Sequence, residues 1–161
     1  MQDCTAYTNH SSLTVKTRSV MTCLKHTAVK NWELTKIDIG GAYLCASMNN
    51  GKVFMMLDKS MTVFCEGWLP NMKKYLREDE KLIVKVDKAM YRLIQSAKLW
   101  YNKLFSSIMT KGFKNHPTDD CIFVKQMNNG MYVIALFCVD DILVMSELQS
   151  DRDWVKVILE Q

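Results

Sequence analysis

The stretch Met131-Tyr-Val-Ile-Ala-Leu-Phe-Cys-Val-Asp-Asp-Ile-Leu-Val-Met145 places two adjacent aspartates, Asp140 and Asp141, inside an otherwise apolar run. Two apolar segments on either side of a short polar break predict a β-hairpin. Hairpin turns usually contain Asn-Gly or Asp-Gly, which tolerate positive φ angles. Adjacent carboxylates repel each other unless a cation neutralises them, and a hard divalent metal ion is a common remedy. From these residues alone, a metal site and a plain solvated turn are equally good interpretations.

A third carboxylate, Asp38, lies in the segment Leu34-Thr-Lys-Ile-Asp-Ile-Gly-Gly-Ala-Tyr-Leu44. Its apolar residues predict a strand that ends at Gly40-Gly41, with a turn or helix beginning at Ala42. Two glycines at a strand end let the backbone approach a ligand closely. The alternative, which Asp38 taken alone favours, is a strand-end aspartate that caps the next helix.

Together these motifs resemble the palm of a reverse transcriptase, of the type encoded by copia-like LTR retrotransposons. In that family a metal-binding aspartate precedes a small-residue turn and Ala-Phe/Tyr-Leu, which corresponds here to Asp38-Ile-Gly-Gly-Ala-Tyr43-Leu44. The family's Tyr-Val-Asp-Asp motif corresponds to Cys138-Val-Asp-Asp141. Its Lys-Ser/Ala-Leu-Tyr-Gly-Leu-x-Gln and Trp-Tyr elements correspond to Lys88-Ala-Met-Tyr-Arg-Leu-Ile-Gln95 and Trp100-Tyr101.

Weaker matches extend the resemblance over roughly residues 11–161, in the order of the family. They are Leu13–Val20, Gly112-Phe113 and Asp119-Asp120-Cys121. The chain departs from the family pattern at Cys138, where the family has Tyr, at Arg92, where it has Gly, and at Cys45, where it has Asn. The family also continues past the position of Gln161 into the rest of the palm, a thumb and an RNase H domain. We therefore expect a fragment or a decayed copy, with residues 1–12 disordered and 13–161 forming a partial fingers and palm domain.

The resemblance implies an α+β fold, with the antiparallel palm sheet and its packing helices plus part of the fingers, truncated before the thumb. It implies RNA-directed DNA polymerisation with an RNA template, a DNA primer and deoxynucleoside triphosphates, and Mg²⁺ or Mn²⁺ as the cofactor. Asp38, Asp140 and Asp141 would be the catalytic metal ligands, with Asp38 and Asp140 as the bridging pair. The missing thumb and RNase H parts would lie on another chain or be lost.

Four further residues acquire substrate-binding roles from the resemblance, each with a plainer alternative. Tyr43 would pack beneath the nucleotide sugar and exclude a 2′-hydroxyl, or it is simply a core residue. Gln95 would hydrogen-bond the incoming nucleotide, or it is a polar residue on a helix surface. Lys16 and Arg18 would hold the triphosphate, because Arg binds phosphate oxygens bidentately, or they belong to a solvated surface.

Charge is unevenly distributed along the chain, whose net charge is +4. Residues 85–115 carry seven Lys/Arg and one acid, whereas residues 116–161 carry three Lys/Arg and eight acids. A basic body beside an acidic end suits an enzyme that follows a phosphate backbone and gathers Mg²⁺. Arg92 and Lys98 are the candidate nucleic-acid contacts. The alternative is a solvated basic helix face.

Composition excludes several classes of protein. The six cysteines form no C-x-x-C pair, which argues against a zinc site and favours reduced thiols in a cytosolic-type compartment. No apolar run approaches the ~18 residues of a membrane span, and no signal peptide is evident. We expect no membrane partner, and a location in the cytoplasm (within a virus-like particle) or the nucleus.

Periodicity and turn residues predict the remaining elements. The predicted helices are 19–29, 88–111 and 151–160, the last built around Trp154, Val157 and Ile158. The predicted strands, besides those described above, are 53–57, 82–86 and 121–125, the last paired with 131–137 across Asn128-Asn-Gly130. Residues 61–77, which include Pro70, are expected to form an irregular connection.

Two other functions compete with polymerisation. One is an inactive relic or domesticated domain that binds RNA or an RNA–DNA duplex, which the expected loss of the thumb and the change at Cys138 favour. The other is a metal-dependent phosphohydrolase. The sequence argues against it, because it lacks the further carboxylates or histidines that such sites usually gather. The retained aspartates favour catalysis, although we expect the isolated chain to extend a primer poorly.

Overall fold

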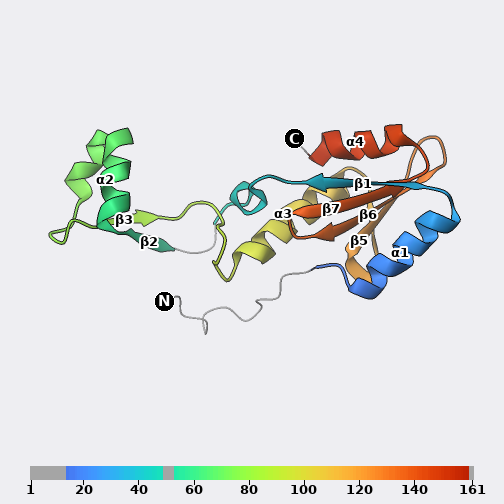
Figure 1. Cartoon of the computed structure of the whole chain (residues 1–161), viewed down its shortest axis with the longest axis horizontal. Coiled ribbons are helices and arrows are strands. Elements are labelled where there is room, and N and C mark those ends of the chain that lie inside the picture. The colour runs from blue at the N-terminus through green and yellow to red at the C-terminus, as the bar shows by residue number, and fades with distance from the viewer. Residues whose placement is uncertain (1–13, 49–52, 160–161) are drawn as a thin grey trace.

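A computed structural model describes residues 14–48 and 53–159, and it is a mixed α+β structure built on one antiparallel sheet (Figure 1). The five strands follow the order β1-β7-β6-β5-β4. Their bounds are β1 Glu33–Asp38, β4 Lys114–His116, β5 Asp119–Gln126, β6 Tyr132–Cys138 and β7 Asp141–Ser146. The predicted α+β class and antiparallel sheet are confirmed, while the division into palm and fingers stays a prediction. The predicted disorder of residues 1–12 lies outside the described residues.

Two predicted hairpins form the middle of the sheet. Strands β5 and β6 pair across a turn in which Gly130 has φ 81°, and the Asn129 side chain accepts a hydrogen bond from the Met131 backbone N–H at 2.9 Å. Strands β6 and β7 then pair with Cys138 opposite Asp141, so the tight turn between them holds only Val139 and Asp140. The sequence prediction of both hairpins is confirmed.

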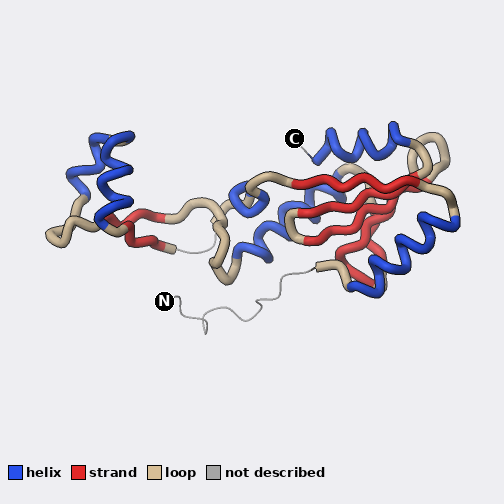
Figure 2. The backbone as a smooth tube through the Cα atoms, in the orientation of Figure 1, coloured by secondary structure: helices blue, strands red, loops and turns tan. Residues whose placement is uncertain are grey.

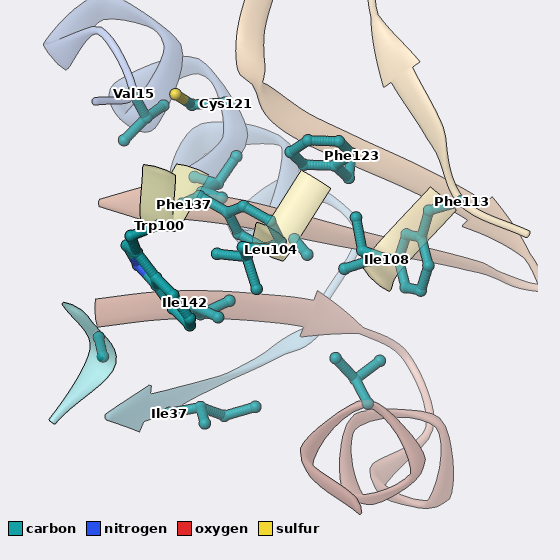
Figure 3. Packing of buried hydrophobic residues seen from close by; sticks show 14 of the residues in the cluster. Val15, Ile37, Trp100, Leu104, Ile108, Phe113, Cys121, Phe123, Phe137 and Ile142 are labelled. Atoms are coloured by element: carbon teal, nitrogen blue, oxygen red, sulfur yellow. The ribbon is translucent and has the colours of Figure 1, made fainter. Parts of the chain in front are cut away.

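The core lies between the sheet and two helices, α3 (Ser96–Thr110) and α4 (Gln149–Leu159). Figure 3 shows side chains of α3 packed against the sheet. These buried α3 residues are Trp100, Leu104 and Ile108, and the sheet residues that they meet include Phe123, Phe137 and Ile142. Helix α1 (Thr17–Val29) covers part of the opposite face of the sheet. Ile122 and Ile134 point away from α3. Together with side chains of α1, they line one cavity.

A second, smaller unit extends away from the main sheet and is called the small lobe here (Figures 1 and 2). It consists of β2 (Phe54–Leu57), helix α2 (Lys59–Trp68), the 3₁₀ helix η3 (Pro70–Tyr75) and β3 (Leu82–Lys85). Strands β2 and β3 pair with each other and with no strand of the main sheet among the described residues.

The predicted irregular connection over residues 61–77 is wrong, because α2 and η3 occupy most of it. Asp58 caps α2, since its side chain accepts a hydrogen bond from the Met61 backbone N–H at 2.9 Å. A proline then opens η3, where its missing N–H costs no helical hydrogen bond. Both are recognised helix-start signals, and the prediction overlooked them.

The helix predicted from Lys88 begins at Ser96 instead. The preceding segment is held by other contacts: the Ala89 N–H donates to the Ala46 carbonyl at 2.9 Å, and the Met90 N–H donates to Ser96 Oγ at 3.0 Å. Arg92 has φ 70°, which reverses the hand of the backbone. Gln95 therefore lies at the N-cap of α3 and not one helical turn past Tyr91.

The other two helices differ from prediction in smaller ways. Helix α1 begins at Thr17 rather than Ser19, and α4 (Gln149–Leu159) begins at Gln149 rather than Asp151. The predicted end of α4 at residue 160 lies outside the described residues. The predicted apolar face of α4 is partly wrong, since Val157 is 54% exposed while Val155 and Ile158 are buried.

Two expectations from composition concern membrane-spanning helices and cysteine thiols. Within residues 14–48 and 53–159, no helix has both the length and the apolar character needed to cross a bilayer. The cysteines in these ranges are all free thiols.

Replacing Arg92 by glycine is expected to stabilise the protein. A residue with a Cβ pays roughly 1–2 kcal/mol for the left-handed conformation that glycine adopts freely. We expect Arg92→Gly to raise the free energy of unfolding by about 1 kcal/mol, measured by urea denaturation. Arg92→Ala is the control, because it removes the charged side chain and keeps the Cβ. An equal gain in both variants would attribute the effect to charge and not to backbone strain.

Candidate functional site

The turn between β6 and β7 is strained and held from two sides. Val139 has φ 60°, a left-handed conformation that a β-branched residue rarely adopts. The indole N–H of Trp100 donates to the Val139 carbonyl at 2.9 Å, and the Ile39 N–H donates to the Asp140 carbonyl at 3.0 Å. Strain of this kind persists only where surrounding contacts impose it, and it is frequent at functional sites.

Three aspartates meet at this end of the sheet. Strand register places Asp38, the last residue of β1, directly opposite Asp141, the first residue of β7. Opposite residues of antiparallel strands have Cα atoms about 4.5–5.5 Å apart, and Asp140 is the neighbour of Asp141 in the turn. Two segments about a hundred residues apart in sequence thus bring three carboxylates to adjacent strand ends.

Two of these carboxylates have specific partners. Lys36 Nζ lies 2.9 Å from Asp141 Oδ1, and the Tyr91 hydroxyl donates a hydrogen bond to Asp140 Oδ2. The bond to Asp140 raises the pKa of Tyr91 to about 12, and the bond to Asp141 raises the pKa of Lys36. The other oxygen of Asp140, Oδ1, is buried and has no hydrogen-bond partner among the described residues.

The donor chemistry of the site fits a hard divalent cation. Carboxylate oxygens are the ligands that Mg²⁺ prefers, and a buried carboxylate oxygen without a partner is one that a cation would satisfy. Across residues 14–48 and 53–159, however, no three acidic, histidine or cysteine side chains gather closely enough to hold one metal ion. The roles of Asp38, Asp140 and Asp141 as metal ligands stay predictions.

Tyr43 reaches the aspartates through Tyr91. It lies in the 3₁₀ helix η2 (Ala42–Cys45), which follows a left-handed turn at Gly41 with φ 65°. The rings of Tyr43 and Tyr91 meet edge to face with centroids 4.6 Å apart. Burial, and then the charge of Asp140, raise the pKa of Tyr43. The half-buried position of Tyr43 fits neither a fully buried core residue nor a free surface one.

The other predicted site residues lie elsewhere. Lys16 and Arg18 line a cavity of about 830 Å³ between α1 and the sheet, and its lining includes none of the three aspartates. Lys16 Nζ donates to the Thr118 carbonyl at 2.9 Å. Arg92 and Lys98 are exposed, the latter on α3.

Sequence reasoning assigned no role at the site to Lys36 and Tyr91. Lys36 could have been found, because residues two apart on a strand share a face and Lys36 precedes Asp38 by two. A diagonal contact across the β1–β7 pair then brings it to Asp141. No local signal marks Tyr91, because the apolar spacing of its segment predicts a helix.

A smaller cavity of about 420 Å³ adjoins Asp38. Asp38, Gly40, Trp100 and Lys103 contribute to its lining, together with the end of α4. Lys103 Nζ donates to the Cys45 carbonyl at 2.6 Å and so ties α3 to η2 beside the site.

Sequence comparison finds relatives of this chain among transposon polyproteins. The chain is 25% identical over 133 residues to the Retrovirus-related Pol polyprotein from transposon TNT 1-94 of Nicotiana tabacum, covering 83% of this chain and 9% of that protein. It is 28% identical over 138 residues to the corresponding polyprotein from transposon RE1 of Arabidopsis thaliana, covering 86% and 8%. The chain thus spans less than a tenth of these relatives. No solved structure matches it.

Residues 2–160 match the protein family described as Reverse transcriptase (RNA-dependent DNA polymerase). This match covers nearly the whole chain, and it confirms the resemblance that the aspartate motifs predicted. The chain therefore belongs to the reverse transcriptase family.

Proposed function

We propose that this chain is the fingers and palm portion of an RNA-directed DNA polymerase from a copia-like retrotransposon. It would extend a DNA primer with deoxynucleoside triphosphates on an RNA template. The observation that carries the proposal is the strand register, which sets Asp38 opposite Asp141 with Asp140 in the adjoining turn.

The chemistry assigned to the site is attack of the primer 3′-oxygen on the α-phosphate of the nucleotide. When bound, Mg²⁺ or Mn²⁺ supplies the positive charge that stabilises the attacking and leaving oxygens. Asp38, Asp140 and Asp141 would hold it through carboxylate oxygens. Trp100 and the Ile39 amide would keep the turn in place, because both bind backbone carbonyls of the turn.

The remaining residues have proposed roles of unequal support. Tyr43 has the best support, since its ring contacts Tyr91, which is bound to Asp140; it would exclude a ribose 2′-hydroxyl. Gln95 would contact the nucleotide from the start of α3. Lys16 and Arg18 would bind phosphate groups in the cavity under α1, together with hydroxyls such as Ser19.

Primer extension by a chimera tests the proposal. The part of this chain that aligns with the RE1 polyprotein would replace the matching 138-residue segment, after that polyprotein has been shown to synthesise DNA with its own segment. We expect Mg²⁺-dependent extension of a DNA primer on an RNA template. A folded chimera that binds the duplex without extending it would support the inactive, nucleic-acid-binding alternative, which Cys138 favours as a departure from the family pattern.

The basic segment, residues 85–115, should make the affinity of the chain for a nucleic-acid duplex fall as the salt concentration rises. Each phosphate contact contributes about 0.9 to the slope of log affinity against log salt concentration. We expect Lys98→Ala to reduce this slope by about 1 for an RNA–DNA duplex, because Lys98 is an exposed lysine of α3. Lys25→Ala, which removes an exposed lysine of α1, is the control. Equal slopes in Lys98→Ala and the parent would leave Lys98 as a solvated surface residue.

A further inference from the structure

The two hairpin carboxylates are each engaged by a side chain that no metal-binding role requires. We propose that Lys36 and Tyr91 compete with a divalent cation for the oxygens of Asp141 and Asp140, and so set the cation concentration at which the site fills. The inference rests on the proposed function, because it takes these aspartates as the cation ligands.

Lys36 competes through charge. Its ammonium lies 2.9 Å from Asp141 Oδ1 and on the strand face that Asp38 shares. It therefore neutralises part of the negative charge that would attract a cation to the site. The side chains of Lys36 and Asp141 are 57% and 44% exposed. An ion pair this exposed is weak, so Lys36 can yield to a divalent cation.

Tyr91 competes through a hydrogen bond to a charged acceptor. Its hydroxyl occupies Asp140 Oδ2, while Oδ1 of the same carboxylate is buried without a partner among the described residues. A cation at Asp140 would satisfy Oδ1, and to bind both oxygens it must displace the Tyr91 hydroxyl. Tyr91 is 61% exposed, so the ring can turn outward without opening the core.

The backbone around these contacts is fixed, which confines the exchange to side chains. The Asp140 carbonyl accepts from the Ile39 amide, and Asp141 is held in register between Asp38 and Cys138. Release of Lys36 and Tyr91 from the two carboxylates therefore needs side-chain rotation and no change in the sheet.

Titration calorimetry with Mn²⁺ on the full 161-residue chain tests the inference. We expect Tyr91→Phe to tighten Mn²⁺ binding about tenfold, because it removes a hydrogen bond to a carboxylate and keeps the ring contact with Tyr43. We expect Lys36→Met to tighten it about threefold, because the lost ion pair is exposed. Lys36→Arg keeps the charge and should bind Mn²⁺ like the parent.

Matched controls separate these effects from general changes of charge or ring polarity. Tyr132→Phe removes the hydroxyl of an exposed tyrosine of β6, and Lys25→Met removes a lysine of α1; neither should change Mn²⁺ affinity. Circular dichroism spectra check that each variant is folded. Thermal denaturation gives a second measure: Mn²⁺ should raise the midpoint more in Tyr91→Phe than in the parent.

The Asp140→Asn variant distinguishes two kinds of failure. If Asp140→Asn binds Mn²⁺ as well as the parent, or if no variant binds it, the cation site itself is wrong. If Asp140→Asn loses binding while Tyr91→Phe and Lys36→Met bind no more tightly than the parent, the site stands and the competition is refuted.

Discussion

Asp140→Asn is expected to lower DNA synthesis by the chimera about a thousandfold. An amide removes the negative charge and one strong oxygen donor from the turn, while its carbonyl can still accept the Tyr91 hydrogen bond. Metal ions stabilise such transition states by several kcal/mol, and each 1.36 kcal/mol changes the rate about tenfold. The measurement is the rate of primer extension at saturating Mg²⁺.

The control for this variant is Asp120→Asn. Asp120 is an exposed aspartate that, like Asp140, is next to a second acid, but it lies on β5 and lines neither cavity described above. Its replacement should leave the rate of extension unchanged. If Asp140→Asn retained most of its activity, the aspartate pair would not be the metal ligand, even if the chimera is a polymerase.

Phe123→Ala is expected to destabilise the main sheet by about 3–5 kcal/mol, the range found for deletion of a buried aromatic ring. Phe123 is completely buried. The centroid of its ring lies 4.6 Å from the ring centroid of Phe137 and 5.7 Å from that of Phe105. Since small domains have total stabilities of about 5–15 kcal/mol, a large part of the molecules would unfold on mild heating. Urea denaturation followed by circular dichroism measures the change.

Phe64→Ala provides the comparison, because Phe64 is 62% exposed on α2 in the small lobe. Exposed substitutions usually change stability by less than about 0.5 kcal/mol. If the two variants lost similar amounts of unfolding free energy, Phe123 would not lie in the core in the way described.

The sheet and the aspartate end could be predicted because their signals are local or shared with a known family. The apolar run around Asp140 and Asp141 specifies a hairpin by itself, and the Asn128-Asn-Gly130 turn specifies the one before it. The position of Asp38 at the end of β1 followed from its strand pattern and the two glycines. Its pairing with Asp141, however, needed the resemblance, because no local signal connects the two segments.

The errors arose where distant contacts override a local pattern. Residues 88–95 have apolar spacing that suits a helix, but the Ala89 amide bonds to Ala46 and Arg92 takes a left-handed conformation. The contact between Tyr91 and Asp140 joins residues 49 positions apart, so periodicity could not reveal it. The error at α2 is different, since the Asp58 cap is a local signal that is visible in the sequence.

The small lobe has consequences for how the protein opens. Its buried apolar residues, Leu57 and Leu82, do not belong to the central core cluster, and many of its large side chains, such as Trp68 at 76% exposure, face outward. Regions with few buried contacts open locally while the rest of the molecule stays folded. Amide hydrogens of β2 and β3 should therefore exchange with deuterium well before those of β6, so the chain behaves as two cooperative units and not one.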